Sequence, residues 1–367
     1  MEKTFIYKAT IGLLFLTLLF GFLYFAKAFL VPVFLAAFLS MLMLPVAKQF
    51  EDWNIHRGVS VGISIFLLFL ILSGIIFLLT HQVISFANEL PNLTDKILVK
   101  LDNVQRFIEE RFGVSSQDQI TYIKSHATEL LETLALNLQG VLAATTGTII
   151  TVGLIIIYMF FFMFYRGKFK KFLFSITSEK DGIDRDKIIQ QISEVTQQYL
   201  AGLGIVIIIL AILNSVGLLI IGIEQAVFFG ILAALLNLIP YIGSALGGIF
   251  PFIMALLTKD SIWYAVAVAG VMMFNQFIEN NFLTPHIVGS KVKVNPLAAI
   301  MAILIGGMVW GVAGMILFIP LVGILKVIFD NIPNLHPYAE LIGENGEPRV
   351  KGKVKKTKIF RSKPVKN

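Results

Sequence analysis

The sequence predicts an all-α polytopic membrane protein with about eight membrane helices. Its 367 residues are 57% hydrophobic and only 14% charged, and their mean hydropathy is +0.83. A helix needs about 20 apolar residues to cross the hydrocarbon core of a bilayer. Eight stretches near or above that length contain no Asp, Glu, Lys or Arg: 9–26, 28–47, 58–80, 133–165, 195–223, 225–258, 261–278 and 294–325. This distribution excludes a soluble enzyme, a nucleic-acid-binding module and a secreted domain.

Residues 1–80 are expected to form three membrane helices. Lys3 and Lys8 precede an apolar stretch that ends at Ala26, which gives the start of the chain some likeness to a signal peptide. The apolar core of a signal peptide has about 7–15 residues, whereas this stretch has 18 and a second one follows at once. We therefore expect a retained first helix that pairs with the second across a short turn at Lys27.

Residues 81–145 have the pattern of amphipathic helices outside the membrane. Apolar residues recur there at steps of three and four: Leu90, Leu93, Ile97, Leu101, Val104 and Ile108, then Ile120, Ile123, Ala127, Leu130 and Leu134. Such spacing predicts two helices with one apolar face each, which turn about Gly113. We expect an extracytoplasmic helical hairpin. Its apolar face could pair with itself, with the membrane domain or with another subunit.

Residues 146–200 are expected to hold a fourth membrane helix and a cytoplasmic interfacial segment. The segment 168–174 reads KFKKFLF, and this mixture of cations and aromatic rings is typical of a helix at the level of the lipid headgroups. We therefore expect it to contact membrane lipids. Residues 188–199 then continue as an amphipathic helix into the next crossing.

Residues 201–330 are expected to form a C-terminal membrane core with two interrupted segments. The stretches 225–258 and 294–325 have 34 and 32 residues, so either one as a straight helix would measure about 50 Å. Each must tilt strongly or break, and each contains residues that weaken a helix: Asn237, Pro240, Gly243, Gly247, Gly248 and Pro251 in the first, and Gly306, Gly307, Gly311, Gly314 and Pro320 in the second. A pair of interrupted segments indicates a transport site, although glycines also serve close helix packing.

A polar run lies between the two interrupted segments. Gln276, Glu279 and Asn280 are spaced at i, i+3 and i+4, which places them on one face of a helix. A carboxylate at membrane depth usually marks a proton or ion path; alternatively, Glu279 lies at the water interface. The single residues Asn214 and Asn237 in apolar stretches are typical of hydrogen bonds between helices.

Residues 331–367 form a basic tail, for which we expect disorder and a cytoplasmic location. From position 349 onward the tail carries nine Lys or Arg and no acidic residue, so it accounts for the net charge of +7. Anionic lipid headgroups would attract it; a solvated tail or an RNA contact is the alternative. With both termini in the cytoplasm, Lys and Arg gather on the inner side. This topology places Lys259 inside and Lys291 and Lys293 outside. The two outer lysines fit the concentration of positive charge on the inner side least well.

Several kinds of chemistry find no motif in the chain. The sequence has no cysteine, no P-loop motif and no H-E-x-x-H zinc motif. No histidine and no aspartate lies in a predicted spanning segment, which argues against intramembrane serine and aspartic proteases. We therefore expect no enzyme activity, no cofactor and no bound metal.

Three motifs together resemble the autoinducer-2 exporter family, also called PerM-type permeases. They are AVFFGILAALLNLIPYIGSALGGIFP at 226–251, ENNFLTPHIVGSKVKVNP at 279–296 and GGMVWGVAGMILFIPLVGIL at 306–325. The resemblance covers essentially the whole chain, apart from the outer hairpin and the basic tail. It implies a bacterial inner-membrane permease with about eight helices that assembles as a homo-oligomer. Members of the family are described as exporters of autoinducer-2 or as sodium/proton antiporters.

The leading hypothesis is a secondary permease that exports a small polar solute, with Glu279 as the residue that couples transport to protons. The residues proposed for the path are Asn237, Pro240, Gly243, Gln276, Glu279, Asn280, Gly306, Gly307, Gly311, Gly314 and Pro320. The alternatives are a sodium(lithium)/proton antiporter and a membrane scaffold that does not transport. Expected partners are the solute or ion, membrane lipids and further copies of the chain, without nucleic acid.

Overall fold

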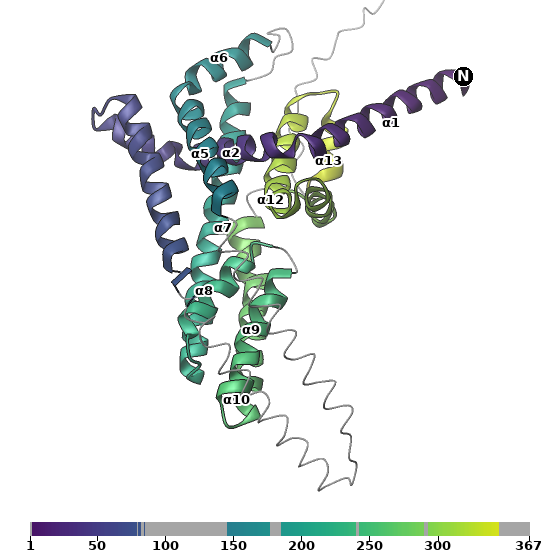
Figure 1. The fold of residues 1–367 in the computed structure, drawn as a ribbon. Coiled ribbons are helices and arrows are strands. Elements are labelled where there is room, and N and C mark those ends of the chain that lie inside the picture. The colour runs from purple at the N-terminus through teal and green to yellow at the C-terminus, as the bar shows by residue number, and fades with distance from the viewer. Residues whose placement is uncertain are drawn as a thin grey trace, which may run out of the picture.

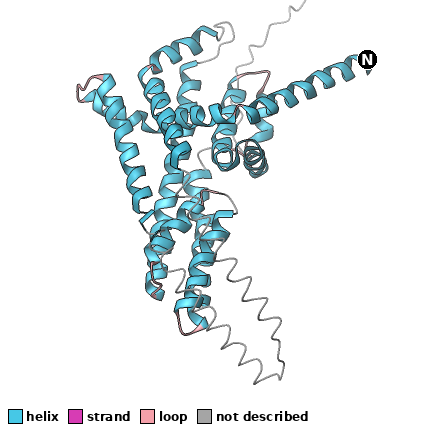
Figure 2. Ribbon diagram, viewed as in Figure 1, coloured by secondary structure: helices cyan, strands magenta, loops and turns pink. Residues whose placement is uncertain are grey.

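A computed structural model of the chain describes residues 2–78, 80–81, 84, 145–176, 185–239, 242–289 and 293–344. Within these ranges every regular element is a helix (Figures 1 and 2). Six helices there are long and apolar enough to cross a membrane, or seven when one bent pair counts as a single span. The predicted all-α polytopic membrane fold is confirmed. The expected outer hairpin and the tail from residue 345 onward lie outside the described residues. The first part of the tail, for which disorder was expected, contains the helix α13 (His336–Ile342).

The first two helices form a bent rod rather than a hairpin. Only Ala26 separates α1 (Glu2–Phe25) from α2 (Lys27–Asp52). Its torsions are near-helical (φ −84°, ψ 7°), its amide donates to Phe22 O, and its carbonyl accepts from the amide of Leu30. Helical hydrogen bonding therefore passes from one helix into the next, and the chain cannot reverse. As a result α1 projects from the body (Figure 1), and the expected pairing across Lys27 is not formed.

α2 packs with the helix Arg57–Leu78 and with α5 (Thr145–Phe164). Their shared core consists of apolar side chains: Ala36, Met43, Ala47, Val61, Ile65, Ile155, Met159 and Met163. α6 (Arg166–Ile176) then turns away from α5 by 67°. The expected interfacial segment 168–174 lies in this helix, and the ammonium of Lys168 lies 4.7 Å from the centre of the Tyr165 ring.

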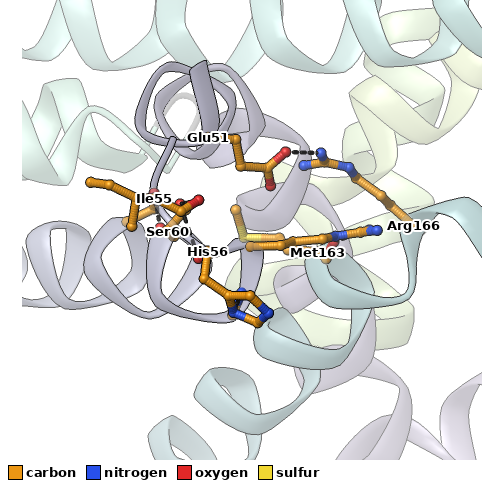
Figure 3. Close-up of polar contacts among 9 residues, drawn as sticks. Glu51, Ile55, His56, Ser60, Met163 and Arg166 are labelled. Atoms are coloured by element: carbon orange, nitrogen blue, oxygen red, sulfur yellow. Dashed lines mark hydrogen bonds and ion pairs between the residues drawn. The ribbon is translucent and has the colours of Figure 1, made fainter. Parts of the chain in front are cut away.

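A charged cluster joins these helices where α2 and α5 end (Figure 3). Arg166 forms an ion pair with Glu51, and Nη2 of Arg57 donates to the carbonyl of Met163 at 3.0 Å. The carbonyls in the last turn of a helix have no partner within the helix. Arg57 therefore satisfies a carbonyl at the end of α5, while Arg166 ties the start of α6 to α2.

α7 (Arg185–Ile221) is the long central helix of the C-terminal core (Figure 1). It has 37 residues and measures about 55 Å. The amphipathic segment 188–199 and the crossing that follows it are thus one continuous helix. α2, α8, α10 and α12 all pack against it.

The first interrupted stretch is broken into α8 (Ala226–Leu236) and α9 (Ile242–Thr258). α8 lies against α7, where a Cβ on Gly230 would collide with Ser215. α9 then folds back on α8, because a Cβ on Gly247 would come within 2.9 Å of Ala233. The predicted break is therefore a helical hairpin, and its two arms meet through glycine.

α10 (Ile262–Ile278) and the π-helix η2 (Glu279–Gly289) return along α7. A Cβ on Gly217 of α7 would collide with Val271 of α10, and one on Gly202 would come within 2.9 Å of Ile287 O in η2. The contact positions fall on α7 as they rise on α10 and η2, so the two segments are antiparallel.

α12 (Pro296–Asn331) is also a hairpin. Gly311 has φ 63° and ψ −142°, a backbone conformation that favours glycine. Gly306 and Gly314 lie in backbone contact across the bend, since a Cβ on either one would collide with the carbonyl of the other. In a straight helix these residues would be about 12 Å apart. The second predicted interruption is thus confirmed, with its apex at Gly311.

Candidate functional site

A cavity of about 390 Å³ lies among α7, α8, α9 and α10. Its apolar wall includes Leu210, Ala233, Phe252, Met272 and Met273. Its polar groups are those of Asn214, Asn237, Ser244, Asn275 and Gln276. None of the described residues that line it is Asp, Glu, Lys, Arg or His. A largely apolar pocket with a few polar groups is the usual form of a site for a small molecule.

The break between α8 and α9 brings Asn237 and Gly243 to this cavity. The amide of Asn237 donates to Ala233 O at 3.1 Å, and the amide of Gly243 donates to Ile239 O at 2.9 Å. Gly243 is buried against the end of α8, where a Cβ would collide with Leu236 O. Irregular backbone at membrane depth is tolerated where it is buried in protein or lines a cavity, and this break meets both conditions. Pro240 lies outside the described residues.

Asn275 and Asn214 form a buried amide pair at the side of the cavity. Nδ2 of Asn275 donates to Oδ1 of Asn214 at 2.9 Å, and each residue is 5% exposed. The bond connects α10 to α7, which is the role that the sequence predicts for Asn214. Asn237 differs from this interpretation because it lines the cavity at the end of α8.

Glu279 lies one turn beyond the cavity and is connected to it by Gln276. Nε2 of Gln276 donates to Glu279 Oε2 and, at 3.2 Å, to Asn280 Oδ1. Oγ1 of Thr284 donates to Glu279 Oε1 at 2.5 Å. Glu279 is 8% exposed, and it is the first residue of the π-helix, an element that often occurs at functional sites. The three polar residues predicted to share one helix face are therefore joined by hydrogen bonds.

The predicted path residues of α12 do not line this cavity. Gly306 and Gly314 hold the arms of the hairpin together, and a Cβ on Gly307 would come within 2.8 Å of the Met315 side chain. Pro320 is buried. Close packing is therefore observed at Gly306, Gly307 and Gly314, and a part of the α12 residues in a transport path stays a prediction. Among the described residues no group of three His, Cys, Asp or Glu could hold a metal ion.

Sequence reasoning did not assign Asn275 and Ser244 to the site. Asn275 directly precedes Gln276 in the polar run, and consecutive residues on a helix point about 100° apart. Asn275 and Gln276 nevertheless both line the cavity, because α7, α8 and α9 surround this part of α10. For Asn275 the available signal was the whole polar run rather than one helix face. For Ser244 it was the position directly after Gly243 in the interrupted stretch.

Comparison with known proteins identifies the family. The family described as AI-2E family transporter matches residues 13–334. The chain belongs to this family. A Bacillus subtilis member named as a transport protein, YueF, is 29% identical over 328 residues, which are 86% of this chain and 87% of the relative. The AI-2 transport protein TqsA of Escherichia coli is 24% identical over 323 residues, which are 87% of this chain and 91% of the relative.

A third relative, MT0215 of Mycobacterium tuberculosis, is also named as a transport protein. It is 27% identical over 322 residues, which are 86% of each chain. The resemblance seen in the three sequence motifs is thus confirmed over nearly the whole chain. The protein is a multi-pass membrane protein of a transporter family.

Proposed function

We propose that this protein is a secondary permease that exports a small, uncharged polar solute similar to autoinducer-2. The observation that carries the proposal is the uncharged cavity at the break between α8 and α9, with its three asparagines and one glutamine. A carboxamide offers both donors and an acceptor, so these side chains suit a solute that carries several hydroxyl groups. The name of the Escherichia coli relative supports autoinducer-2 as the first solute to test.

The same proposal gives Glu279 the role of the coupling residue. Its carboxylate is buried and accepts hydrogen bonds from Gln276 and Thr284. Gln276 also lines the cavity, so a change in the charge of Glu279 would be transmitted to the solute through one side chain. A buried carboxylate near a transport site is a usual carrier of protons or cations.

A sodium(lithium)/proton antiporter is the second candidate, and the burial of Glu279 favours it too. The two candidates differ in what crosses the membrane. Purified protein in liposomes should be tested with autoinducer-2, with neutral polyols of similar size, and with Na⁺ and Li⁺. Saturable flux of the neutral solute supports the permease. Loss of an imposed pH gradient on addition of Na⁺ or Li⁺ alone would favour the antiporter.

The coupling role is tested by Glu279→Gln. We expect solute flux to continue but to lose its dependence on the proton gradient, because the amide cannot take up a proton at this position. Glu224→Gln is the matched control, since Glu224 is exposed in the link between α7 and α8. Unchanged coupling in Glu279→Gln would remove Glu279 from the mechanism.

We further propose a location in the bacterial inner membrane with both termini in the cytoplasm, contact between α6 and lipid headgroups, and assembly as a homo-oligomer. The alternation of Lys168, Lys170 and Lys171 with aromatic residues in α6 supports the lipid contact. The family resemblance is the ground for the oligomer, and α1, whose apolar span is 0% buried in a single chain, offers a surface that lipid or another copy of the chain would cover. The mass of the protein in nanodiscs tests the oligomer. The lipid contact is tested by native mass spectrometry, which should find fewer anionic lipids retained by Lys171→Gln than by the unaltered protein.

A further inference from the structure

We propose that Glu279 carries its proton on Oε1, the oxygen that faces Thr284, and that Gln276 keeps its amide nitrogen on Oε2 whether Glu279 is charged or neutral. Thr284 is then a positioning residue for proton uptake, and Gln276 always presents a hydrogen-bond acceptor to the solute. This assignment rests on the coupling role proposed for Glu279 and names the atoms that carry it out.

The two oxygens of the Glu279 carboxylate have different kinds of partner. Nε2 of Gln276 donates to Oε2, whereas Oγ1 of Thr284 donates to Oε1 at 2.5 Å. An amide nitrogen can only donate a hydrogen bond, but a hydroxyl can donate or accept one. A proton on Oε2 would therefore face an amide hydrogen. A proton on Oε1 meets an oxygen that can accept it once the hydroxyl of Thr284 has turned.

A second hydrogen bond holds Gln276 in this orientation. Its Nε2 also donates to Oδ1 of Asn280 at 3.2 Å, so both hydrogens of the amide are in use. If the amide of Gln276 reversed, its carbonyl oxygen would face Oδ1 of Asn280, and Asn280 would have to turn as well. Proton uptake on Oε1 of Glu279 requires neither movement.

Thr284 has an alternative acceptor for its own hydrogen. In three other threonines the hydroxyl donates to the carbonyl four residues earlier, at 2.8 or 2.9 Å: Thr17, Thr196 and Thr258. This is a common bond of a threonine within a helix. For Thr284 that carbonyl belongs to Asn280, and the donor to it in the i→i+5 pattern of a π-helix would be Pro285, which has no N–H. The Thr284 hydrogen can therefore turn to Asn280 O when Oγ1 accepts the proton of Glu279.

Among the described residues, no other titratable group bonds to Glu279. The π-helix η2 packs against α7 and α10. The other titratable side chains on these three elements are Arg185, Asp186, Lys187, Glu194 and Tyr199 on α7, Tyr264 on α10 and His286 on η2. In the described part of the chain, the hydrogen-bond partners of the Glu279 carboxylate are Gln276 and Thr284 alone. The proton is thus shared with Thr284 and not with a second charge.

The assignment also fixes what Gln276 offers to the solute. Gln276 lines the cavity, and because its nitrogen is bound to Glu279 and Asn280, it has its carbonyl oxygen left for a solute. A bound solute must therefore donate a hydrogen bond to Gln276, as a hydroxyl group does. A hydrogen bond to a charged acceptor is roughly twice as strong as one to a neutral acceptor. Proton uptake therefore loosens Gln276 from Glu279 without reversing its amide.

Infrared difference spectroscopy on the purified protein in lipid tests the assignment, because the C=O stretch of a protonated carboxyl rises in frequency when the carbonyl oxygen loses a hydrogen-bond donor. Spectra are recorded at low and high pH without solute. The band of Glu279 is the part of the difference that is missing in Glu279→Gln. Gln276→Met removes the donor to Oε2, and Thr284→Val removes the hydroxyl at Oε1 while keeping the shape of the side chain. Thr284→Ser is the matched control because it keeps a hydroxyl.

With the proton on Oε1, Oε2 is the carbonyl oxygen of the neutral acid. We therefore expect the Glu279 band to rise in frequency in Gln276→Met, to rise by less in Thr284→Val and to stay in place in Thr284→Ser. An unchanged band in Gln276→Met, or a rise in Thr284→Val that equals or exceeds the one in Gln276→Met, would overturn the assignment. Gln276→Leu also lacks the donor and takes the place of Gln276→Met if that variant does not fold.

The measurement requires no transport, so its failure is distinct from a failure of the proposed permease activity. A Glu279 band with the wrong order of shifts would overturn the assignment alone. If no band depends on Glu279 over the pH range in which the protein stays folded, Glu279 takes up no proton. That result would overturn both the assignment and the coupling role, whereas solute flux through the cavity would be unaffected by it.

Discussion

The two interrupted hairpins are built from similar residues but have different surroundings. In both, glycine allows the arms to meet: Gly247 contacts Ala233 in the α8–α9 hairpin, and Gly306 contacts Gly314 in α12. The α8–α9 break ends in Asn237 and opens on a cavity with five polar side chains. The α12 bend is followed by apolar residues and packs Trp310 against Phe34 of α2. Gly and Pro content therefore indicates where a membrane segment breaks, and the polar side chains beside the break make the α8–α9 hairpin, rather than α12, the candidate binding site.

The largest effect is expected where the two arms of α12 meet at Gly306 and Gly314. Gly314→Leu places a branched side chain against the Gly306 carbonyl, and the backbone there cannot yield as a flexible side chain can. We expect a loss of about 3 kcal/mol in the free energy of unfolding, seen as reduced yield and a lower melting temperature in detergent. Gly270→Leu is the control, because a Cβ on Gly270 meets no atom within 4 Å. Equal stability of the two variants would show that the α12 arms do not need glycine contact.

The second prediction separates transport from packing. Asn237→Leu removes a carboxamide from the cavity and is expected to lower solute flux about tenfold, as the loss of one hydrogen bond to a bound solute would do. Gly307→Ala is the matched change in α12, where the flexible Met315 side chain can move aside. Its flux should stay close to that of the unaltered protein. If both variants lose flux equally, α12 also belongs to the path, and the two hairpins do not differ in function.

A third prediction concerns the amide pair beside the cavity. Asn275→Leu removes the hydrogen-bond partner of the buried Asn214 side chain. Asn214→Leu likewise removes the partner of the Asn275 side chain. Each single variant should lose about 1 kcal/mol of stability, the scale of hydrogen bonds between membrane helices. The double variant Asn214→Leu/Asn275→Leu should lose less than the sum of the two single changes, because it leaves no unpaired amide. Additive losses in thermal unfolding would mean that the two residues act separately.

Much of the fold follows from the sequence because charge and apolar length are local properties. Where the structure describes them, the charge-free stretches lie in helices, and the stretches 225–258 and 294–325 both break. The pairing of α1 with α2 could not be predicted correctly in this way, since a single charge at Lys27 does not make a turn. A chain reverses only where the backbone torsions leave the helical region. Those of Ala26 stay close to it, so α1 and α2 do not fold back on each other.

The position of a break and the membership of a cavity depend on contacts between distant residues. Several glycines in 306–314 were equivalent in the sequence, and Gly311 becomes the apex because Gly306 and Gly314 meet across it. The cavity likewise collects Asn214, Asn237 and Gln276 from three helices. The spacing of polar residues within one helix identified Gln276 and Glu279, but it carried no information about which other helices would face them.

The smallest effect is expected at the base of the α12 hairpin. Oδ1 of Asn295 accepts from the amide of Ala298 at 2.8 Å, so Asn295 caps α12, while its Nδ2 reaches Leu341 O of the segment that follows the hairpin. Asn295→Ala should cost about 1 kcal/mol of stability through the lost cap. Asn295→Asp keeps the acceptor and loses the donor, so it should recover the cap but not the link to Leu341. Because α12 packs against other helices and does not line the cavity, both variants should lower the melting temperature and leave the solute flux of the folded protein unchanged. A selective loss of flux in either one would assign the base of α12 a part in transport.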